Sequence, residues 1–301
     1  MIDGLLLVDK PPGPTSHDVV AALRRAVGQK RIGHTGTLDP AATGLMVVLM
    51  GSATRLSGAF LDQAKRYEAV IELGAATDTG DAAGRITEKA PIPPLVVQDV
   101  ERAVHALEGD RRHRPPAYSA VKVAGTPMYA LARKGEEPPD VAERTISVYR
   151  AALRSFDAPR LSVDLEVSKG TYVRVLAAEL GASLGVPAHL RALKRTASGT
   201  FALEDATGLS ELVEGGREGI EARIVDLEKT YPGMTRARAL EPALRGIAHG
   251  RPLLAADLDF IDPPATDVLV LNDGKAIAWY VERDGAYRPR AVLVSRAEEV
   301  A

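Results

Sequence analysis

A glycine- and threonine-rich segment at residues 33–44 holds the carboxylate with the clearest chemical potential. It reads Gly-His-Thr-Gly-Thr-Leu-Asp-Pro-Ala-Ala-Thr-Gly, so Asp39 stands between a leucine and a proline, just ahead of an apolar run. Glycines permit unusual dihedral angles and a close approach of other backbone. The segment is neither a Walker A loop nor a GxGxxG motif. Asp39 is therefore either a nucleophile presented by a loop or a cap of a short turn, with Pro40 in a first-turn position.

Two further segments combine a tyrosine with cations. Lys65-Arg66-Tyr67 opens an alternating stretch. In the functional interpretation, Tyr67 would offer an aromatic face to a base and the two cations would neutralise phosphate. The simpler interpretation is a cationic strand end with a half-exposed tyrosine. Residues 168–174, Ser-Lys-Gly-Thr-Tyr-Val-Arg, join an expected strand to an expected helix. They form either a plain helix start or a junction from which Tyr172 and Arg174 enter a cleft, where Arg174 pairs with a carboxylate.

The elements around these segments predict an α+β fold. Apolar or alternating runs indicate strands at 5–8, 45–50, 67–73, 119–123, 149–154 and 161–167. Thr15-Ser16 precedes an apolar pattern with helical spacing that ends at Gly28, which predicts a capped helix. Further helices are expected at 99–107, 128–134 and 173–184, and a polar turn at 78–84. The irregular mixture of strands and helices favours α+β over a doubly wound sheet.

The last part of the chain has a different pattern. Residues 204–228 are acidic and predicted to be helical, and Tyr231-Pro232-Gly233 is typical of a linker. Strands are expected at 268–271, 276–281 and 291–294, separated by Asp273-Gly274 and Asp284-Gly285. Asp-Gly pairs are hairpin signals. We therefore expect a catalytic domain at 1–232 and a small β domain at 236–301.

Composition narrows the classes of protein. The 301 residues carry a net charge of −2, which divides into +4 for residues 1–199, −5 for 200–230 and −1 for the remainder. This balance neither demands nor excludes an RNA partner. There are no cysteines, and the six histidines lack metal-ligand spacing, so we expect no metal and no cofactor. No apolar run approaches the length of a membrane span and no secretory signal is visible, so a cytoplasmic protein is expected. The cationic run 111–114 is predicted to be a solvated basic loop that could touch phosphate.

Six segments that follow one another in a fixed order indicate a family far more specifically than any single segment does. These are 6–17, 33–44, 65–67, 115–122, 168–174 and 193–196, the last three reading Pro-Pro-Ala-Tyr-Ser-Ala-Val-Lys, Ser-Lys-Gly-Thr-Tyr-Val-Arg and Leu-Lys-Arg-Thr. The chain resembles the TruB family of bacterial tRNA pseudouridine synthases, which act on uridine 55 of the T-loop, over about residues 4 to 200. The resemblance implies a bent, mostly antiparallel sheet and a small β-rich PUA-like domain. It also implies a partner tRNA, bound at the T-arm and elbow without a guide RNA, and we expect a monomer.

The resemblance also assigns roles to individual residues. It implies that Asp39 is the catalytic aspartate, that Tyr67 stacks on the target base, and that Arg174 pairs with the catalytic carboxylate. It further implies that Tyr172 lines the base pocket and that His34 helps to displace the target nucleotide.

The chemistry is consistent with the motifs that are present. Converting uridine to pseudouridine breaks N1–C1′ and makes C5–C1′ without net redox change, so one ionised, well-placed carboxylate suffices. Attack at C6, attack at C1′ and a glycal route all remain open. The main alternative is a non-catalytic RNA-binding protein or tRNA-folding chaperone. A small-molecule enzyme that uses one aspartate is a third possibility, although it leaves the tyrosines and cations unexplained.

Overall fold

The computed structural model describes residues 1–119, 121–134, 141–227 and 234–293 and divides the chain into two compact units. One unit comprises Met1–Leu38, Leu45–Leu61 and Thr200–Ala301, and the other comprises Asp39–Gly44 and Asp62–Gly199. The expected linker 231–233 lies outside the described residues, so the division into 1–232 and 236–301 stays a prediction. Among the described residues, no helix combines the length and apolar character that a membrane crossing requires.

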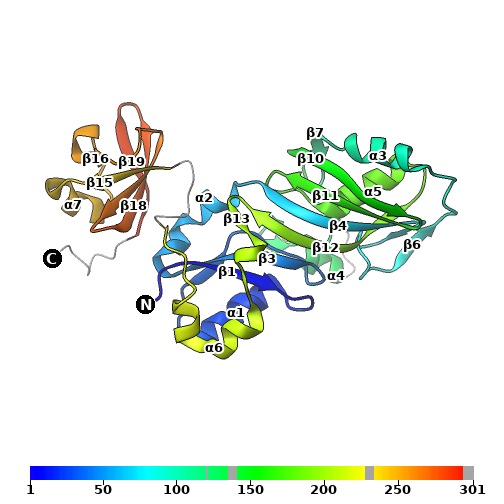
Figure 1. Ribbon diagram of the computed structural model, residues 1–301, viewed down its shortest axis with the longest axis horizontal. Coiled ribbons are helices and arrows are strands. Elements are labelled where there is room, and N and C mark those ends of the chain that lie inside the picture. Colours follow the sequence, from blue (N-terminus) through cyan, green and yellow to red (C-terminus); the bar gives the residue numbers. More distant parts are fainter. Residues whose placement is uncertain (120, 135–140, 228–233, 294–301) are drawn as a thin grey trace. The chain divides into compact units, whose positions relative to one another are not determined.

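The second unit is built on an antiparallel sheet. Five strands follow one another in the order β12 (Ala188–Ser198), β4 (Lys65–Leu73), β11 (Arg160–Val167), β10 (Arg144–Asp157) and β7 (Gly109–His113) (Figure 1). Each of these neighbours runs antiparallel to the next. The start of β3 (Thr43–Met50) pairs with β12 in parallel. The expected mostly antiparallel sheet and the α+β class are therefore confirmed.

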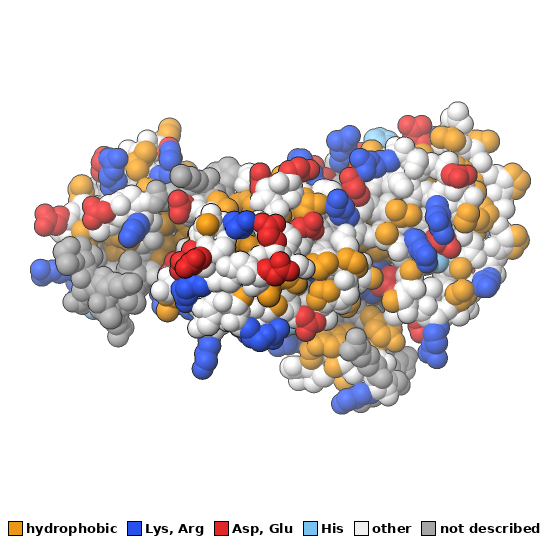
Figure 2. Space-filling view, turned by 60° about the horizontal axis from the view of Figure 1, so that its bottom comes forward, with side chains coloured by type: hydrophobic (Ala, Val, Ile, Leu, Met, Phe, Trp, Pro, Cys, Tyr) orange, Lys and Arg blue, Asp and Glu red, His pale blue; other side chains and the backbone are white. Residues whose placement is uncertain are grey.

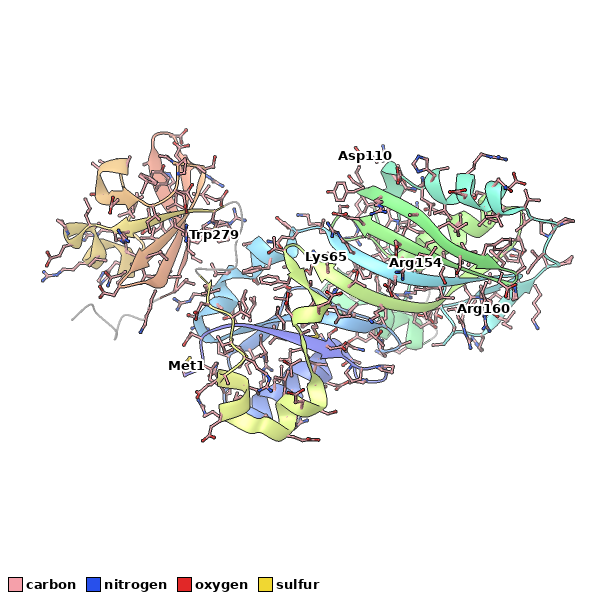
Figure 3. The ribbon with its side chains drawn as sticks, in the orientation of Figure 1. Met1, Lys65, Asp110, Arg154, Arg160 and Trp279 are labelled. Carbon is pink, nitrogen blue, oxygen red and sulfur yellow. The ribbon has the colours of Figure 1, made fainter. Side chains whose placement is uncertain are left out.

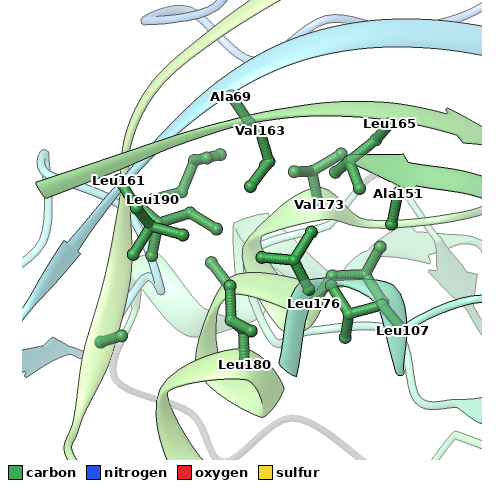
Figure 4. Close-up of a cluster of buried hydrophobic side chains, with 14 of the residues drawn as sticks. Ala69, Leu107, Ala151, Leu161, Val163, Leu165, Val173, Leu176, Leu180 and Leu190 are labelled. Atoms are coloured by element: carbon green, nitrogen blue, oxygen red, sulfur yellow. The ribbon is translucent and has the colours of Figure 1, made fainter. Parts of the chain in front are cut away.

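Two helices cover one face of this sheet. α5 (Val173–Ser183) packs on β12 and β4, and α3 (Val97–His105) packs on β10. Val173, Leu176 and Leu180 of α5 meet the inward-facing residues of the strands, among them Val163 and Leu165 (Figure 4). Burying one such side chain contributes about 1.5–3 kcal/mol. This core anchors the helix that begins directly after Tyr172.

Two short strand pairs and one short helix complete the described part of the second unit. β5 (Ala75–Thr77) pairs with β6 (Ile86–Lys89), β8 (Lys122–Val123) pairs with β9 (Thr126–Pro127), and α4 spans Met128–Arg133. The predicted strand 119–123 is wrong in extent, because among its described residues only Lys122 and Val123 pair, and residue 120 lies outside the described residues. The predicted basic loop at 111–114 is also wrong. Its first three residues belong to β7, where backbone pairing with β10 outweighs the polar composition.

The part of the first unit that precedes the C-terminal sheet joins strands to the helices α1, α2 and α6. β1 (Gly4–Lys10) lies between β3 and β14 (Thr207–Gly208), and β2 (Ile32–His34) pairs with β3. α1 (Ser16–Val27) begins with the predicted cap, because Thr15 and Asp18 form a reciprocal capping box, and it ends at Gly28 in the left-handed region. α6 is confined to Leu209–Glu221, shorter than the predicted 204–228. The remaining elements are β13 (Phe201–Ala202), α2 (Ser57–Leu61) and 3-10 turns at Gly51–Leu56 and Leu203–Asp205.

A five-stranded sheet forms the C-terminal β-rich part. Its order is β16 (Leu258–Phe260), β15 (Thr235–Ala239), β17 (Asp267–Asn272), β18 (Lys275–Arg283) and β19 (Ala286–Val292), with α7 at Glu241–Ala248 and a 3-10 turn at Ala255–Asp257. Both predicted Asp-Gly hairpins are confirmed, since both residues of each pair have positive φ, as a type I′ turn requires. The last strand spans 286–292 and so includes only the first two residues of the predicted 291–294, of which residue 294 lies outside the described residues.

Polar side chains inside this sheet have partners. The indole N–H of Trp279, which lies on β18 (Figure 3), donates to the Asp267 carboxylate at 2.8 Å. The hydroxyl of the fully buried Tyr280 donates to the carbonyl of Arg251 at 2.8 Å, and burial raises the pKa of Tyr280 to about 12. Such pairing removes the cost of burying a polar group.

Candidate active site

Asp39 forms an ion pair with Arg174, which lies 135 residues further along the chain. The arginine Nε lies 3.0 Å from Oδ2 of Asp39, and Nη2 lies 3.4 Å from Oδ1. The arginine side chain is only 4% exposed, whereas that of the aspartate is 39% exposed. The carboxylate is therefore reachable from solvent while its cation is held inside the protein.

Backbone carbonyls fix the plane of the Arg174 guanidinium. Nη1 donates to the carbonyl of Thr79 and Nη2 donates to the carbonyl of Tyr118, both at 2.8 Å. A second carboxylate oxygen, Oδ2 of Asp81, lies 3.8 Å from Nε. A guanidinium satisfies several acceptors in one plane, which the point charge of a lysine does not. Arg174 is thus oriented before any ligand binds.

The turn that contains Asp81 is the part of the site that sequence reasoning missed. The Thr79 hydroxyl donates to Oδ1 of Asp81 at 2.7 Å, and the backbone N–H of Ala83 donates to the same oxygen at 3.0 Å. Backbone hydrogen bonds between Leu190 of β12 and the turn residues Gly80 and Ala82, both 3.0 Å long, hold the turn on the sheet. The signal in the sequence is the dense polar run Thr-Asp-Thr-Gly-Asp at 77–81, which by itself predicts only a turn.

Local structure also shapes the loop before and after Asp39. The Ser16 hydroxyl accepts from the N–H of Leu38 at 2.9 Å and lies 3.1 Å from its carbonyl, so the preceding residue is fixed. The backbone carbonyl of Asp39 accepts from Ala42 at 3.0 Å, which makes a turn. Gly44 has φ +95°, and a β-carbon there would overlap the backbone of Arg195. Glycine therefore lets the loop enter β3 tightly against β12.

Tyr67 lies on the same sheet as this loop. Arg195 of β12 pairs with Tyr67 on one side and with Gly44 on the other, so the three residues form one row across the strands. The backbones of Gly44 and Tyr67 are therefore two strand spacings apart, which is about 10 Å. The half-buried ring of Tyr67 packs at the edge of the core beneath α5. The predicted half-buried strand position is confirmed.

Tyr172 stands directly before α5, two residues from Arg174. Its backbone N–H donates to Nε2 of His113 at 2.9 Å, and the two rings are nearly parallel with centroids 5.9 Å apart. The guanidinium of Arg144 lies 5.3 Å from the centre of the tyrosine ring. The structure thus places Tyr172 and Arg174 at the predicted strand–helix junction.

The predicted cations beside Tyr67 differ from each other. Arg66 is exposed and pairs with Glu166 at 3.1 Å. Lys65, at the start of β4 (Figure 3), is buried, and its Nζ donates to the carbonyl of Gln63 at 2.5 Å. Burial, together with the nearby charge of Arg195, lowers the pKa of Lys65 to about 8.

His34 lies in the first unit, whereas Asp39 belongs to the second. It ends β2 opposite Val48, and its Nδ1 accepts from the N–H of Gly36 at 3.3 Å. Its ring meets that of His17 edge to face at 5.7 Å. The half-buried ring is therefore held by contacts within its own unit.

Charged side chains of both signs are mixed on one face of the molecule. On the face drawn in Figure 2, lysine and arginine side chains are interspersed with aspartates and glutamates, in keeping with the net charge of −2. Recognition of an anionic partner would therefore depend on local groups more than on the overall charge.

Comparison with known sequences decides the family. Residues 24–173 match the model of the TruB family pseudouridylate synthase N-terminal domain. The chain is 46% identical over 233 residues to a protein named tRNA pseudouridine synthase B from Opitutus terrae, covering 77% of this chain and 96% of the relative. It is 37% identical over 304 residues to a protein of the same name from Geobacillus thermodenitrificans, covering 97% and 100%. The chain belongs to the TruB family of pseudouridylate synthases. The expected family and enzyme class are thereby confirmed.

Solved structures support the TruB family fold. The chain is similar to one in a crystal structure of a Cbf5-Nop10-Gar1 complex, with a TM-score of 0.74, 25% identity, and coverage of 99% of this chain and 87% of that one. A chain of the archaeal box H/ACA sRNP Nop10-Cbf5 complex gives a TM-score of 0.72 at 24% identity, over 99% and 88% of the two chains. The similarity extends over nearly the whole chain, including the C-terminal β-rich part.

Proposed function

We propose that this chain converts uridine 55 in the T-loop of tRNA into pseudouridine, with Asp39 as its nucleophile. The ion pair between the exposed Asp39 carboxylate and the buried Arg174 is the observation that carries the proposal. The similar proteins from Opitutus terrae and Geobacillus thermodenitrificans are both named tRNA pseudouridine synthase B, which supports tRNA as the substrate.

The reaction requires mainly that the protein positions the uridine and supplies a correctly placed negative charge. The N1–C1′ bond of the uridine breaks and a C5–C1′ bond forms, so the base is released, turned and rejoined. Asp39 adds to the base at C6 or to the sugar at C1′, or it assists departure of the base along a glycal route. In each case an ionised carboxylate is required, and an adjacent guanidinium favours that form. Arg174 supplies this charge from a position locked by the carbonyls of Thr79 and Tyr118.

The aromatic residues account for access to the base. A uridine in a stacked loop must leave the stack before its C1′ and C5 are accessible, which costs a few kcal/mol. We assign Tyr67 to stacking on the displaced base and Tyr172 to the wall of the base pocket, where one aromatic stack returns about 1–3 kcal/mol. His34 would help to displace the nucleotide. Along the glycal route, Tyr67 would be the candidate to take part in 2′ proton transfer.

The remaining contacts bind the tRNA body. We assign the T-arm and elbow of the tRNA as the partner, bound by one copy of this chain in the cytoplasm without a guide RNA. Exposed Arg66 would approach a phosphate near the target, whereas the buried side chain of Lys65 is held by the Gln63 carbonyl and argues against the predicted phosphate contact there. The C-terminal β-rich part would act as a PUA-like RNA-binding domain. Phosphate contacts make the affinity fall as salt rises.

A position-specific assay tests the substrate. A tRNA transcript is incubated with the protein, and each pseudouridine is located by chemical modification followed by primer extension. A matched transcript carries cytidine at position 55. We expect one pseudouridine at position 55 in the first transcript and none in the second. Modification elsewhere with position 55 untouched would overturn the assignment of the T-loop uridine.

A further inference from the structure

The buried imidazole of His113 holds the beginning of α5. It lies at the end of β7, is 1% exposed, and its Nε2 accepts the N–H of Tyr172 at 2.9 Å. The two rings are parallel to within 10°. The sequence predicts a solvated loop here, whereas the structure buries this histidine against the segment that carries Tyr172 and Arg174.

Only a neutral imidazole with its proton on Nδ1 makes this contact. Nε2 accepts a hydrogen bond, so it carries no proton, and Nδ1 has no hydrogen-bond partner among the described residues. Burial, with the positive charges of Arg144 and Arg111, lowers the pKa of His113 to about 4. Protonation would turn the acceptor into a donor facing another donor. The environment therefore keeps the acceptor form at neutral pH.

The contact is transmitted to Arg174 through the helix backbone. The carbonyl of Tyr172 accepts from the N–H groups of Val175 and Leu176 at 3.0 and 3.3 Å, which closes the first turn around Arg174. The same strand holds the helix a second time, because Arg111 of β7 donates to the carboxylate of Glu179 at 2.9 Å. A shift of Tyr172 would thus move the first turn, while the second contact keeps the helix on the sheet.

We propose that His113 is a positioning residue, whose Nε2 fixes the N–H of Tyr172 and thereby places both the Tyr172 ring and the Arg174 guanidinium relative to Asp39. This inference rests on the proposed function, since it concerns the geometry of that reaction. His113 itself is not expected to touch the RNA, because its side chain is buried.

Two substitutions separate the acceptor from the shape of the ring. His113→Gln places an amide oxygen near the position of Nε2 and preserves an acceptor, whereas His113→Phe preserves a flat ring and removes the acceptor. His105→Phe, at an exposed histidine on α3, is the matched control. A small displacement of a reacting group costs as much as about 100-fold. We expect kcat to fall at least about tenfold in His113→Phe, with KM for tRNA little changed, and to be restored largely in His113→Gln.

The opposite pattern would overturn the proposal. If His113→Phe lowers only the melting temperature, with kcat per folded molecule unchanged, the histidine is merely structural. If His113→Gln loses as much activity as His113→Phe, the acceptor is not what matters.

Nitrogen NMR at pH 7 tests the same contact without turnover. We expect His113 of the wild-type protein to have a protonated Nδ1 and an unprotonated Nε2, and we expect the Nε–H signal of Arg174 to move in His113→Phe but not in His113→Gln. A protonated Nε2, or an unmoved Arg174 signal, contradicts the inference even if the protein modifies no tRNA. Inactive wild-type protein with the expected signals would instead mean that the proposed function has failed.

Discussion

Arg174 and Asp39 form an ion pair whose two members differ greatly in exposure, with 4% of the arginine side chain and 39% of the aspartate side chain exposed. The arginine is held by two carbonyls and a nearby second carboxylate, so its position does not depend on Asp39 alone. A substrate can therefore reach the carboxylate without uncovering a buried charge. This asymmetry supports the proposed role of Asp39 as the nucleophile.

Arg174→Lys should impair both activity and stability. A lysine ammonium keeps the charge but does not satisfy the carbonyls of Thr79 and Tyr118 together with Asp39. A buried acceptor left unpaired costs about 1–3 kcal/mol, and the partial exposure of Asp39 keeps the total below the cost of breaking a fully buried pair. We expect kcat/KM to fall about 100-fold. Arg160→Lys, in an exposed pair with Glu72, is the control and should change little. Equal kinetics in both variants would contradict the positioning role of Arg174.

Asp81→Asn should lower kcat without unfolding the protein. The amide retains an oxygen for Thr79 and Ala83 but removes the negative charge 3.8 Å from Nε of Arg174. We expect a loss of about tenfold in kcat, equivalent to about 1.4 kcal/mol in the barrier. Asp78→Asn is the matched control, because Asp78 lies in the same turn and pairs with the exposed Arg85. If steady-state kinetics show the same loss for both variants, the turn acts only through its fold.

The buried Lys65 should make stability depend on alkaline pH. Its pKa is about 8 in the folded protein against an ordinary value of 10.5, so between these values the unfolded chain binds the extra proton. The free energy of unfolding contributed by this group therefore rises with pH across that window and is lowest below pH 8. Lys65→Met should remove this dependence and stabilise the protein below pH 8 by at most about 3 kcal/mol. Denaturant unfolding at pH 7 and 10 measures the free energy of unfolding of both proteins. If this free energy changes with pH as much in the variant as in the wild-type protein, Lys65 is not the cause.

Local signals in the sequence predicted most of the elements. The alternation at 67–73 and 161–167 identifies β4 and β11, because one face of each strand packs under α5. Thr15 and Gly28 mark the ends of α1, and the Asp-Gly pairs mark the hairpins, since each depends on the conformation of only a few residues. The resemblance to the TruB family brought Asp39, Tyr67 and Arg174 together as candidates.

Contacts between distant segments were not predictable in the same way. His113 lies in a run of arginines that looks solvated, and only pairing of β7 with β10 buries it. Asp81 belongs to the candidate site only because the fold brings it close to Arg174, which is more than 90 residues away and on another element. Lysine is a residue type that commonly binds phosphate, but the side chain of Lys65 is buried and donates to the carbonyl of Gln63. Register and burial, which no short motif encodes, decide all three cases.

The most direct test of the central claim is tritium release from tRNA transcripts that carry 5-tritiated uridine. The wild-type protein is compared with Asp39→Asn and with Asp157→Asn, which alters an exposed aspartate at the end of β10. Formation of the C5–C1′ bond expels the C5 proton, so release reports the isomerisation itself. We predict release by the wild-type protein and by Asp157→Asn, and none by Asp39→Asn even though it binds tRNA within about tenfold of the wild-type affinity. Release by Asp39→Asn at the wild-type rate would contradict the assignment of Asp39 as the nucleophile.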